Sequence, residues 1–209
     1  ATGARAVSAP IEGSSLDGVF TLHGLDHAAA IRSYLTPPDE FTVDSLGGGD
    51  ALDEAVAERY GAMEPPETVA IVGAGYVGVE MAEAFDAWGV DVHLFQRSDR
   101  PVPGFGDAVG DAVTEHLRDS GVTLHFGEEV RRLDGAGNHV DRVVCGSGAE
   151  LSVDAALVGI GIRPNTDLLD DTPVELGASG AVATDEYGRT SVPNVYAAGD
   201  VAEMRHTVT

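Results

Sequence analysis

Residues 68–97 read TVAIVGAGYVGVEMAEAFDAWGVDVHLFQR and decide the fold class. The apolar, β-branched run Thr68–Val72 predicts a buried strand. Three glycines follow at the spacing G-x-G-x-x-G: Gly73, Gly75 and Gly78. A helical pattern continues to Gly89, a residue type that suits a left-handed helix end, and Val90–Phe95 predicts a second strand. In this strand–turn–helix–strand context, the glycine spacing indicates a dinucleotide-binding site.

Each glycine of this turn has its own physical task. Gly73 permits the tight turn, Gly75 leaves room for a pyrophosphate, and Gly78 lets the helix pack closely on the strand. The N-terminus of the helix that follows offers free N–H groups and the positive end of its dipole to the phosphates. We count Tyr76 and Val77 of the turn among the cofactor-binding residues. The alternative is a glycine-rich turn in some other α/β protein.

The composition limits the partners. The chain has 209 residues, with 35 acidic and 12 basic residues and a net charge of −23. This balance argues against nucleic acid and against anionic membranes, and the chain lacks the apolar run of about 18 residues that a membrane span needs. All the basic residues are arginine, which resembles the composition of proteins from salt-accumulating halophiles, whose self-repulsion salt screens. The alternative is an ordinary acidic mesophile protein.

The cysteine and histidine content indicates no metal or disulfide site. Cys145 stands alone, which excludes an internal disulfide and fits a cytoplasmic protein. We interpret it as a structural thiol. His23 and His27 are separated by a glycine and a helix start, so they do not share a face as metal ligands would.

The rest of the chain predicts an α/β fold with a Rossmann-like parallel sheet and an antiparallel three-stranded meander. We expect a loop over residues 1–19, and helices that start with the caps Asp26 and Asp107. The predicted helices cover residues 25–35, the stretch after the glycine turn that carries Val79 to Trp88, residues 50–63 and 107–120, and part of 163–171. The other predicted strands cover residues 122–126, 129–133, 139–145, 150–153, 155–160, 182–184 and 194–198.

Three further motifs carry a family resemblance. Ala1-Thr2-Gly3, the run 158–165 (VGIGIRPN) and the run 190–200 (TSVPNVYAAGD) resemble the crossing and return motifs of the flavin-dependent pyridine nucleotide–disulfide oxidoreductases. With the glycine turn they occur in the family's order and spacing. The stretch from Ser98 to Val130 most resembles the branch of the coenzyme A-disulfide reductases and NADH oxidases.

The resemblance implies roles for further residues. It places Gly161 close to the nicotinamide and flavin rings, and Gly199-Asp200 at the flavin ribityl or pyrophosphate region, with a helix start after Asp200. It places Tyr76 over the flavin face and Glu80 near the nicotinamide. Each has a simpler alternative: a turn glycine, a helix N-cap, a packing tyrosine or a solvated carboxylate.

The choice between NAD and NADP stays open in the sequence. Enzymes that bind NAD place an acid at the end of the second strand, where it binds the ribose 2′-hydroxyl. This chain has Gln96 there, followed by Arg97 and Arg100. Glutamine still bonds a hydroxyl, and Arg97 could pair with a 2′-phosphate, unless Arg97 is only a surface residue.

The resemblance implies an internal piece of a larger enzyme. Residues 1–19 and 162–209 resemble parts of an FAD domain, and residues 20–161 a complete NAD(P) domain. The parent would be a homodimer that passes hydride from NAD(P)H to FAD and on to a disulfide, such as coenzyme A disulfide, or to dioxygen. We expect this chain to contain no catalytic residue, to bind nucleotide, and to be inactive without the rest of the FAD domain. The alternative is a nucleotide-binding or sensing module without turnover.

Overall fold

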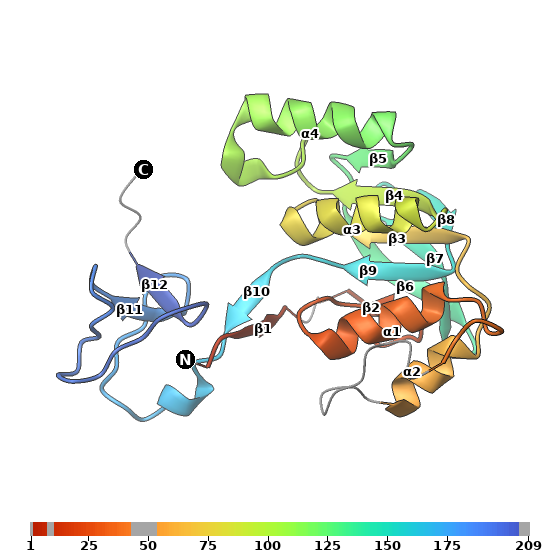
Figure 1. Cartoon of the computed structure of the whole chain (residues 1–209). Helices are drawn as coiled ribbons and strands as arrows, with labels where there is room; N and C mark the ends of the chain where they lie inside the picture. The colour runs from red at the N-terminus through yellow and green to blue at the C-terminus, as the bar shows by residue number, and fades with distance from the viewer. Residues whose placement is uncertain (1, 8–10, 43–53, 205–209) are drawn as a thin grey trace. The chain divides into compact units, whose positions relative to one another are not determined.

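The computed structural model describes residues 2–7, 11–42 and 54–204. The chain forms two compact units: Ser8–Ile160, and Ala1–Val7 together with Gly161–Thr209. Each unit is described by itself below (Figure 1). The assignment of these segments to nicotinamide and flavin domains stays a prediction. Within the described residues, no helix has the length and apolar content needed to cross a membrane.

The larger unit is built on a parallel five-stranded sheet, which confirms the predicted fold class. The strand order is β2-β9-β3-β4-β5, and neighbouring strands all run parallel. Its strands are β2 (Val19–Phe20), β9 (Ala155–Val158), β3 (Thr68–Val72), β4 (Asp91–Gln96) and β5 (Thr123–Phe126). The connecting helices are α3 (Tyr76–Ala87) and α4 (Asp107–Asp119). Gly89 has φ +80° beyond the end of α3, as its residue type predicts.

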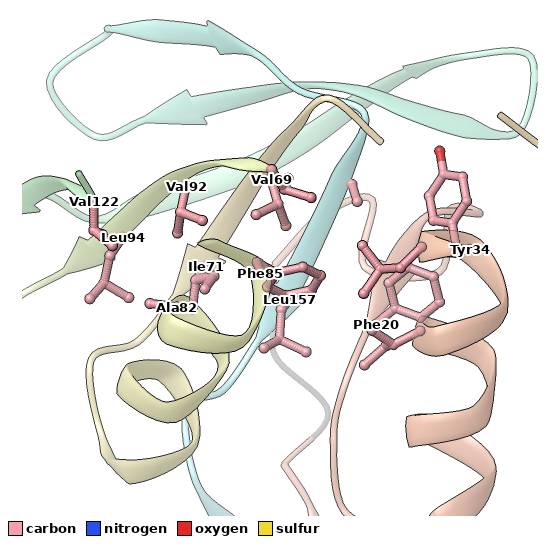
Figure 2. Close-up of a cluster of buried hydrophobic side chains, with 14 of the residues drawn as sticks. Phe20, Tyr34, Val69, Ile71, Ala82, Phe85, Val92, Leu94, Val122 and Leu157 are labelled. Carbon is pink, nitrogen blue, oxygen red and sulfur yellow. The ribbon is translucent and has the colours of Figure 1, made fainter. Parts of the chain in front are cut away.

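Helices cover one face of this sheet. Figure 2 shows Ile71 of β3 and Leu94 of β4 pointing toward Ala82 and Phe85 of α3. The same cluster contains residues of α1 (Leu25–Leu35), α2 (Glu54–Gly61) and α4. Alternate residues along each strand point to opposite faces, so β3 and β4 supply this core from every second position.

The meander covers the opposite face. Its strands β6 (Val130–Ala136), β7 (His139–Cys145) and β8 (Glu150–Ser152) pair antiparallel in sequence order, as predicted. They pack on Ala70, Val72 and Phe95 of the sheet. Cys145 lies in this second core, and burial raises the pKa of its thiol, so the thiolate is disfavoured there.

The described residues of the smaller unit form two strand pairs. β1 (Ala4–Ala6) pairs antiparallel with β10 (Ile162–Pro164). β11 (Val182–Thr184) pairs parallel with β12 (Ala202–Met204). A 3-10 turn, η3 (Asp167–Leu169), follows β10 within the segment that predicted a short helix.

Four local predictions are wrong. Residues 1–19 hold the strands β1 and β2 rather than only loop, because distant segments pair with them. The strand predicted over 194–198 is absent from the described chain; Tyr196 makes a single bridge, and a strand needs a continuous partner. The helix expected after Asp200 is replaced by β12. The helix predicted at 50–63 is not one of these errors: it is found as α2, and residues 50–53 lie outside the described residues.

The fourth error concerns the helix caps. Glycines, not aspartates, precede α1 and α4: the cap residues are Gly24 and Gly106, and neither makes a side-chain cap bond. Asp26 and Asp107 lie inside the first turn instead. A carboxylate at that place still interacts favourably with the positive end of the helix dipole.

Candidate nucleotide-binding site

The turn after β3 has a shape that two of its glycines make possible. Gly73 has φ +102°, and a Cβ added to it would lie 2.6 Å from the Gly159 carbonyl oxygen. A Cβ on Gly78 would lie 1.8 Å from the carbonyl oxygen of Gly73. The chain itself therefore requires these two glycines, one for the turn and one for the close approach of α3 to the strand.

Gly75 is different, because nothing in the described chain requires a glycine there. Its φ of −77° and ψ of −168° are open to any residue, and no atom lies within 4 Å of an added Cβ. The space beside it is open at the N-terminus of α3. A glycine at this position is explained by a group from outside the chain that approaches the backbone closely.

The N-terminus of α3 fits an anionic group. No side chain caps this helix and no acid stands in its first turn. The first N–H groups of a helix and its dipole favour a phosphate. Gly75 and this helix end together therefore make a cradle suited to the pyrophosphate of a dinucleotide.

Two aromatic rings border the turn. Tyr76 begins α3 and is 66% exposed, and its ring meets the Phe105 ring edge-on with 5.5 Å between the centroids. Val77, which follows Tyr76 in α3, is half-buried, and Glu80, one helical turn after Tyr76, is exposed. Phe105 ends the 3-10 turn η2 (Pro103–Phe105) and was not predicted as a site residue. The aromatic residue type within a Pro- and Gly-rich loop is the sequence feature that could have pointed to it.

The end of β4 is tied to the glycine turn through Gln96. The Ala74 N–H donates to Gln96 Oε1 at 3.1 Å, and Gln96 Nε2 donates to Ser98 Oγ at 2.7 Å. Ser98 Oγ in turn donates to the Arg100 carbonyl at 2.9 Å. The side chain of Gln96 therefore connects the glycine turn to the turn after β4.

A second tie comes from the loop beyond Arg100. The Val102 N–H donates to the Ala74 carbonyl at 2.8 Å. Val102 has φ +40° and ψ +55°, which is an outlier for a β-branched residue and costs on the order of 1–3 kcal/mol. Both backbone groups of Ala74 are thus held by this side of the site, and sequence patterns gave no indication of it.

The two arginines of this turn differ in their pairing. Arg100 donates to Asp99 Oδ1 at 3.3 Å and also pairs with Asp107, and these carboxylates raise its pKa. Arg97 is exposed, and no hydrogen-bond or ion-pair partner is found for it among the described residues. Its charge is available to a ligand.

The remaining predicted residues lie in the smaller unit. Gly161 has φ +120° and accepts the Val7 N–H at 3.0 Å, and Gly199 has φ +77°. No atom lies within 4 Å of a Cβ added to either glycine. Asp200 is exposed beside Gly199. The glycine turn, Glu80, Gln96 and Arg97 thus lie in the larger unit, where Gln96 contacts the turn, and Gly161, Gly199 and Asp200 lie in the smaller unit.

The two crossing motifs meet within that smaller unit. Asn165 Nδ2 donates to the Thr2 carbonyl at 2.9 Å, and the Asn165 N–H donates to the Gly3 carbonyl at 3.0 Å. Arg5 donates to Asn165 Oδ1 at 2.8 Å and pairs with Asp167. Two motifs that resemble the family's crossings are therefore hydrogen-bonded partners, although Thr2 and Asn165 are 163 residues apart in the sequence.

Comparison with known proteins decides the family. The sequence model of the pyridine nucleotide-disulphide oxidoreductase family matches residues 1–209. The chain belongs to this family. A relative from Pyrococcus horikoshii, an NAD(P)H coenzyme A polysulfide/persulfide reductase, is 37% identical over 100% of this chain. This chain spans 41% of that relative's length.

Solved structures of the family agree in fold. The water-forming NADH oxidase from Lactobacillus brevis, bound to NADH, matches this chain with a TM-score of 0.74 and 30% sequence identity. The match covers 96% of this chain and 38% of the oxidase chain. An engineered five-substitution mutant of that enzyme, a water-forming NADPH oxidase bound to NADPH, has a TM-score of 0.73 and 30% identity over the same shares. By these descriptions the relatives are oxidoreductases.

Proposed function

We propose that this chain is the NAD(P)H-binding part of an FAD-dependent oxidoreductase. The whole enzyme would pass hydride from NAD(P)H to FAD and on to a disulfide, such as coenzyme A disulfide, or to dioxygen. The open backbone at Gly75 carries the proposal, because within the described chain a glycine is not required there and a pyrophosphate needs it. The relatives supply the acceptor classes, since one is a coenzyme A polysulfide/persulfide reductase and another a water-forming oxidase.

The residues of the larger unit would divide the dinucleotide between them. Gly75 and the N-terminus of α3 would bind the pyrophosphate, while Gly73 and Gly78 shape the turn. The end of β4, at Gln96 and Arg97, would lie at the adenosine ribose. Tyr76, Val77 and Glu80 would lie on the nicotinamide side.

The residues of the smaller unit would serve the flavin. We assign Gly161 to the approach of the nicotinamide and flavin rings, and Gly199 and Asp200 to the ribityl or pyrophosphate region of FAD. FAD, when bound, accepts the hydride and passes on electrons. Residues 1–19 and 162–209 would then belong to an FAD domain and residues 20–161 to the NAD(P) domain. The parent would act as a cytoplasmic homodimer.

The engineered oxidase bears on the ribose end. Three of its substitutions are consecutive and replace Asp-Ala-Met by Ala-Arg-Ser. The mutated aspartate follows that protein's mutated glycine by the same number of residues as Gln96 follows Gly78. We therefore take that glycine as the counterpart of Gly78, which makes Gln96-Arg97-Ser98 the counterparts of the three substituted residues. It shares the missing acid and the arginine with the NADPH-bound mutant, and it shares Gly78 and Pro103 with the NADH-bound parent.

Nucleotide binding by the purified chain tests the proposal. Titration with NADH and with NADPH, followed by nicotinamide fluorescence, should show saturable binding with one site per chain. FAD added to the same chain should not be retained through gel filtration, because much of its site would lie elsewhere in the parent. Absence of saturable binding for both nucleotides would refute the assignment. Assays of the whole parent with coenzyme A disulfide and with dioxygen would identify the acceptor.

A further inference from the structure

We propose that Gln96 is a positioning residue and not the ribose ligand, and that the arginine it positions, Arg97, makes NADPH the preferred nucleotide. This inference rests on the proposed function, because it concerns the ribose end of the same site. It commits to a dinucleotide that carries a 2′-phosphate.

Both ends of the Gln96 side chain are already engaged by the protein. Its carbonyl oxygen accepts the Ala74 N–H at 3.1 Å, and its amide donates to Ser98 Oγ at 2.7 Å. A carboxamide has one oxygen and one NH₂ group, so these two bonds fix its orientation. The hydroxyl of Ser98 is also committed, because it donates to the Arg100 carbonyl.

These bonds fix the backbone on both sides of Arg97. Gln96 lies before it and Ser98 after it, and the Ser98 carbonyl also accepts the Gly127 N–H at 3.0 Å. Arg97 is therefore presented from a held turn beside the glycine turn. An arginine whose backbone is already held loses less backbone freedom when it binds a phosphate.

The charges around this turn leave Arg97 as the cation for a ligand. Arg100 is occupied by Asp99 and Asp107. Seven arginines of the described chain pair with carboxylates, as expected in a chain with 35 acidic and 12 basic residues. Arg32, Arg118 and Arg163 also pair with no carboxylate of the described residues, but they do not lie in the turn after β4.

The absence of an acid at the end of β4 acts in the same direction. A carboxylate there binds the 2′-hydroxyl of NAD and repels a 2′-phosphate. Gln96 is neutral, and the nearby Asp99 is paired with Arg100. A guanidinium forms charge-assisted hydrogen bonds with phosphate oxygens. The turn therefore attracts a 2′-phosphate and gains nothing from a 2′-hydroxyl.

Dissociation constants of the 209-residue chain for NADPH and NADH, measured by nicotinamide fluorescence at one fixed salt concentration, test this. The chain should bind NADPH about 10-fold more tightly than NADH. This factor corresponds to one charge-assisted hydrogen bond, reduced because Arg97 is exposed to solvent. Arg97→Gln should remove that advantage and change the NADH constant by less than about 2-fold. Arg118→Gln, the matched control on α4, should leave both constants unchanged.

Two variants of Gln96 separate positioning from ligation. Gln96→Glu keeps an oxygen for the Ala74 N–H and adds a charge beside Arg97, so NADH should become the preferred nucleotide. Gln96→Leu releases the turn, so the NADPH advantage should fall while NADH still binds. Thermal melting of each variant confirms that it is folded.

The outcomes are distinguishable. Tighter binding of NADH than NADPH by the unmodified chain, or an equal loss for both nucleotides in Arg97→Gln, would overturn the inference and leave the proposed function standing. Loss of NADH binding in Gln96→Leu, in a folded chain, would show that Gln96 is itself the ribose ligand. If neither nucleotide binds the unmodified chain, the proposed function fails, and this inference fails with it.

Discussion

Substitution of Gly75 by valine separates a glycine that serves a ligand from glycines that serve the fold. The backbone angles of Gly75, φ −77° and ψ −168°, suit valine, and no atom lies within 4 Å of the added Cβ. Valine is less favourable than glycine at a helix N-cap, but it restricts the unfolded chain more. These terms oppose each other, and we expect the free energy of unfolding to change by less than about 1 kcal/mol.

Binding should respond far more strongly than stability. The valine side chain would occupy the space through which a pyrophosphate reaches the N–H groups of α3. Each hydrogen bond to a charged group contributes about 1.5–3 kcal/mol. Loss of two such bonds weakens binding by roughly 100-fold or more, at 1.4 kcal/mol per tenfold.

The assay compares nucleotide dissociation constants and thermal unfolding for Gly75→Val and the unmodified chain. Ala84→Val is the matched control, because it adds the same side chain to an exposed position of the same helix. It should leave binding unchanged. If Gly75→Val is folded and binds NADH or NADPH as well as the unmodified chain does, the pyrophosphate does not lie at Gly75 and the reasoning is refuted.

Four further outcomes follow from the charges and contacts of the chain. With a net charge of −23, the melting temperature should rise from 0.05 to about 2 M KCl as salt screens self-repulsion; a flat profile would contradict the halophile-like interpretation. Burial and the neighbouring His93 lower the pKa of His125 in the folded chain, so the unfolded chain binds this proton at a higher pH than the folded chain does. The free energy of unfolding should therefore fall as the pH drops from about 6.5 toward the lowered pKa of the folded state. His125→Phe should flatten that part of the pH profile. Asn165→Ala should cost about 1–2 kcal/mol and speed amide exchange in β1, and unchanged exchange would count against the pairing. Cys145 is 6% exposed, so it should react with thiol reagents only after unfolding; rapid native-state labelling would show otherwise.

The sequence by itself was sufficient for the regular parts of the larger unit. The β-branched run at Thr68–Val72, the glycine spacing and Gly89 determined β3, the turn and α3, because each feature acts through local backbone geometry. Alternating residues predicted the meander in the same way, since side chains of a strand alternate between faces. The family motifs also sufficed to place the chain among the pyridine nucleotide-disulphide oxidoreductases.

Only the tertiary structure decided the features that join distant segments. The pairing of β1 with β10 turned a predicted loop into a strand, and β12 formed where a helix was expected because β11 pairs with it. A strand of three residues has no periodicity to read, so its partner decides its conformation.

The same reason governs the site. Gly75 could be assigned from the glycine spacing, because the requirement for open backbone is local. Gln96 appeared in the sequence as a weak ribose ligand, and only its contact with Ala74 shows it as part of the scaffold. The sequence did not show the left-handed backbone of Val102, nor that Arg97 has no partner among the described residues, since strain and pairing depend on which groups the fold brings together. The sequence determined that a nucleotide turn exists, and the tertiary contacts decided which side chains around it remain free for a ligand.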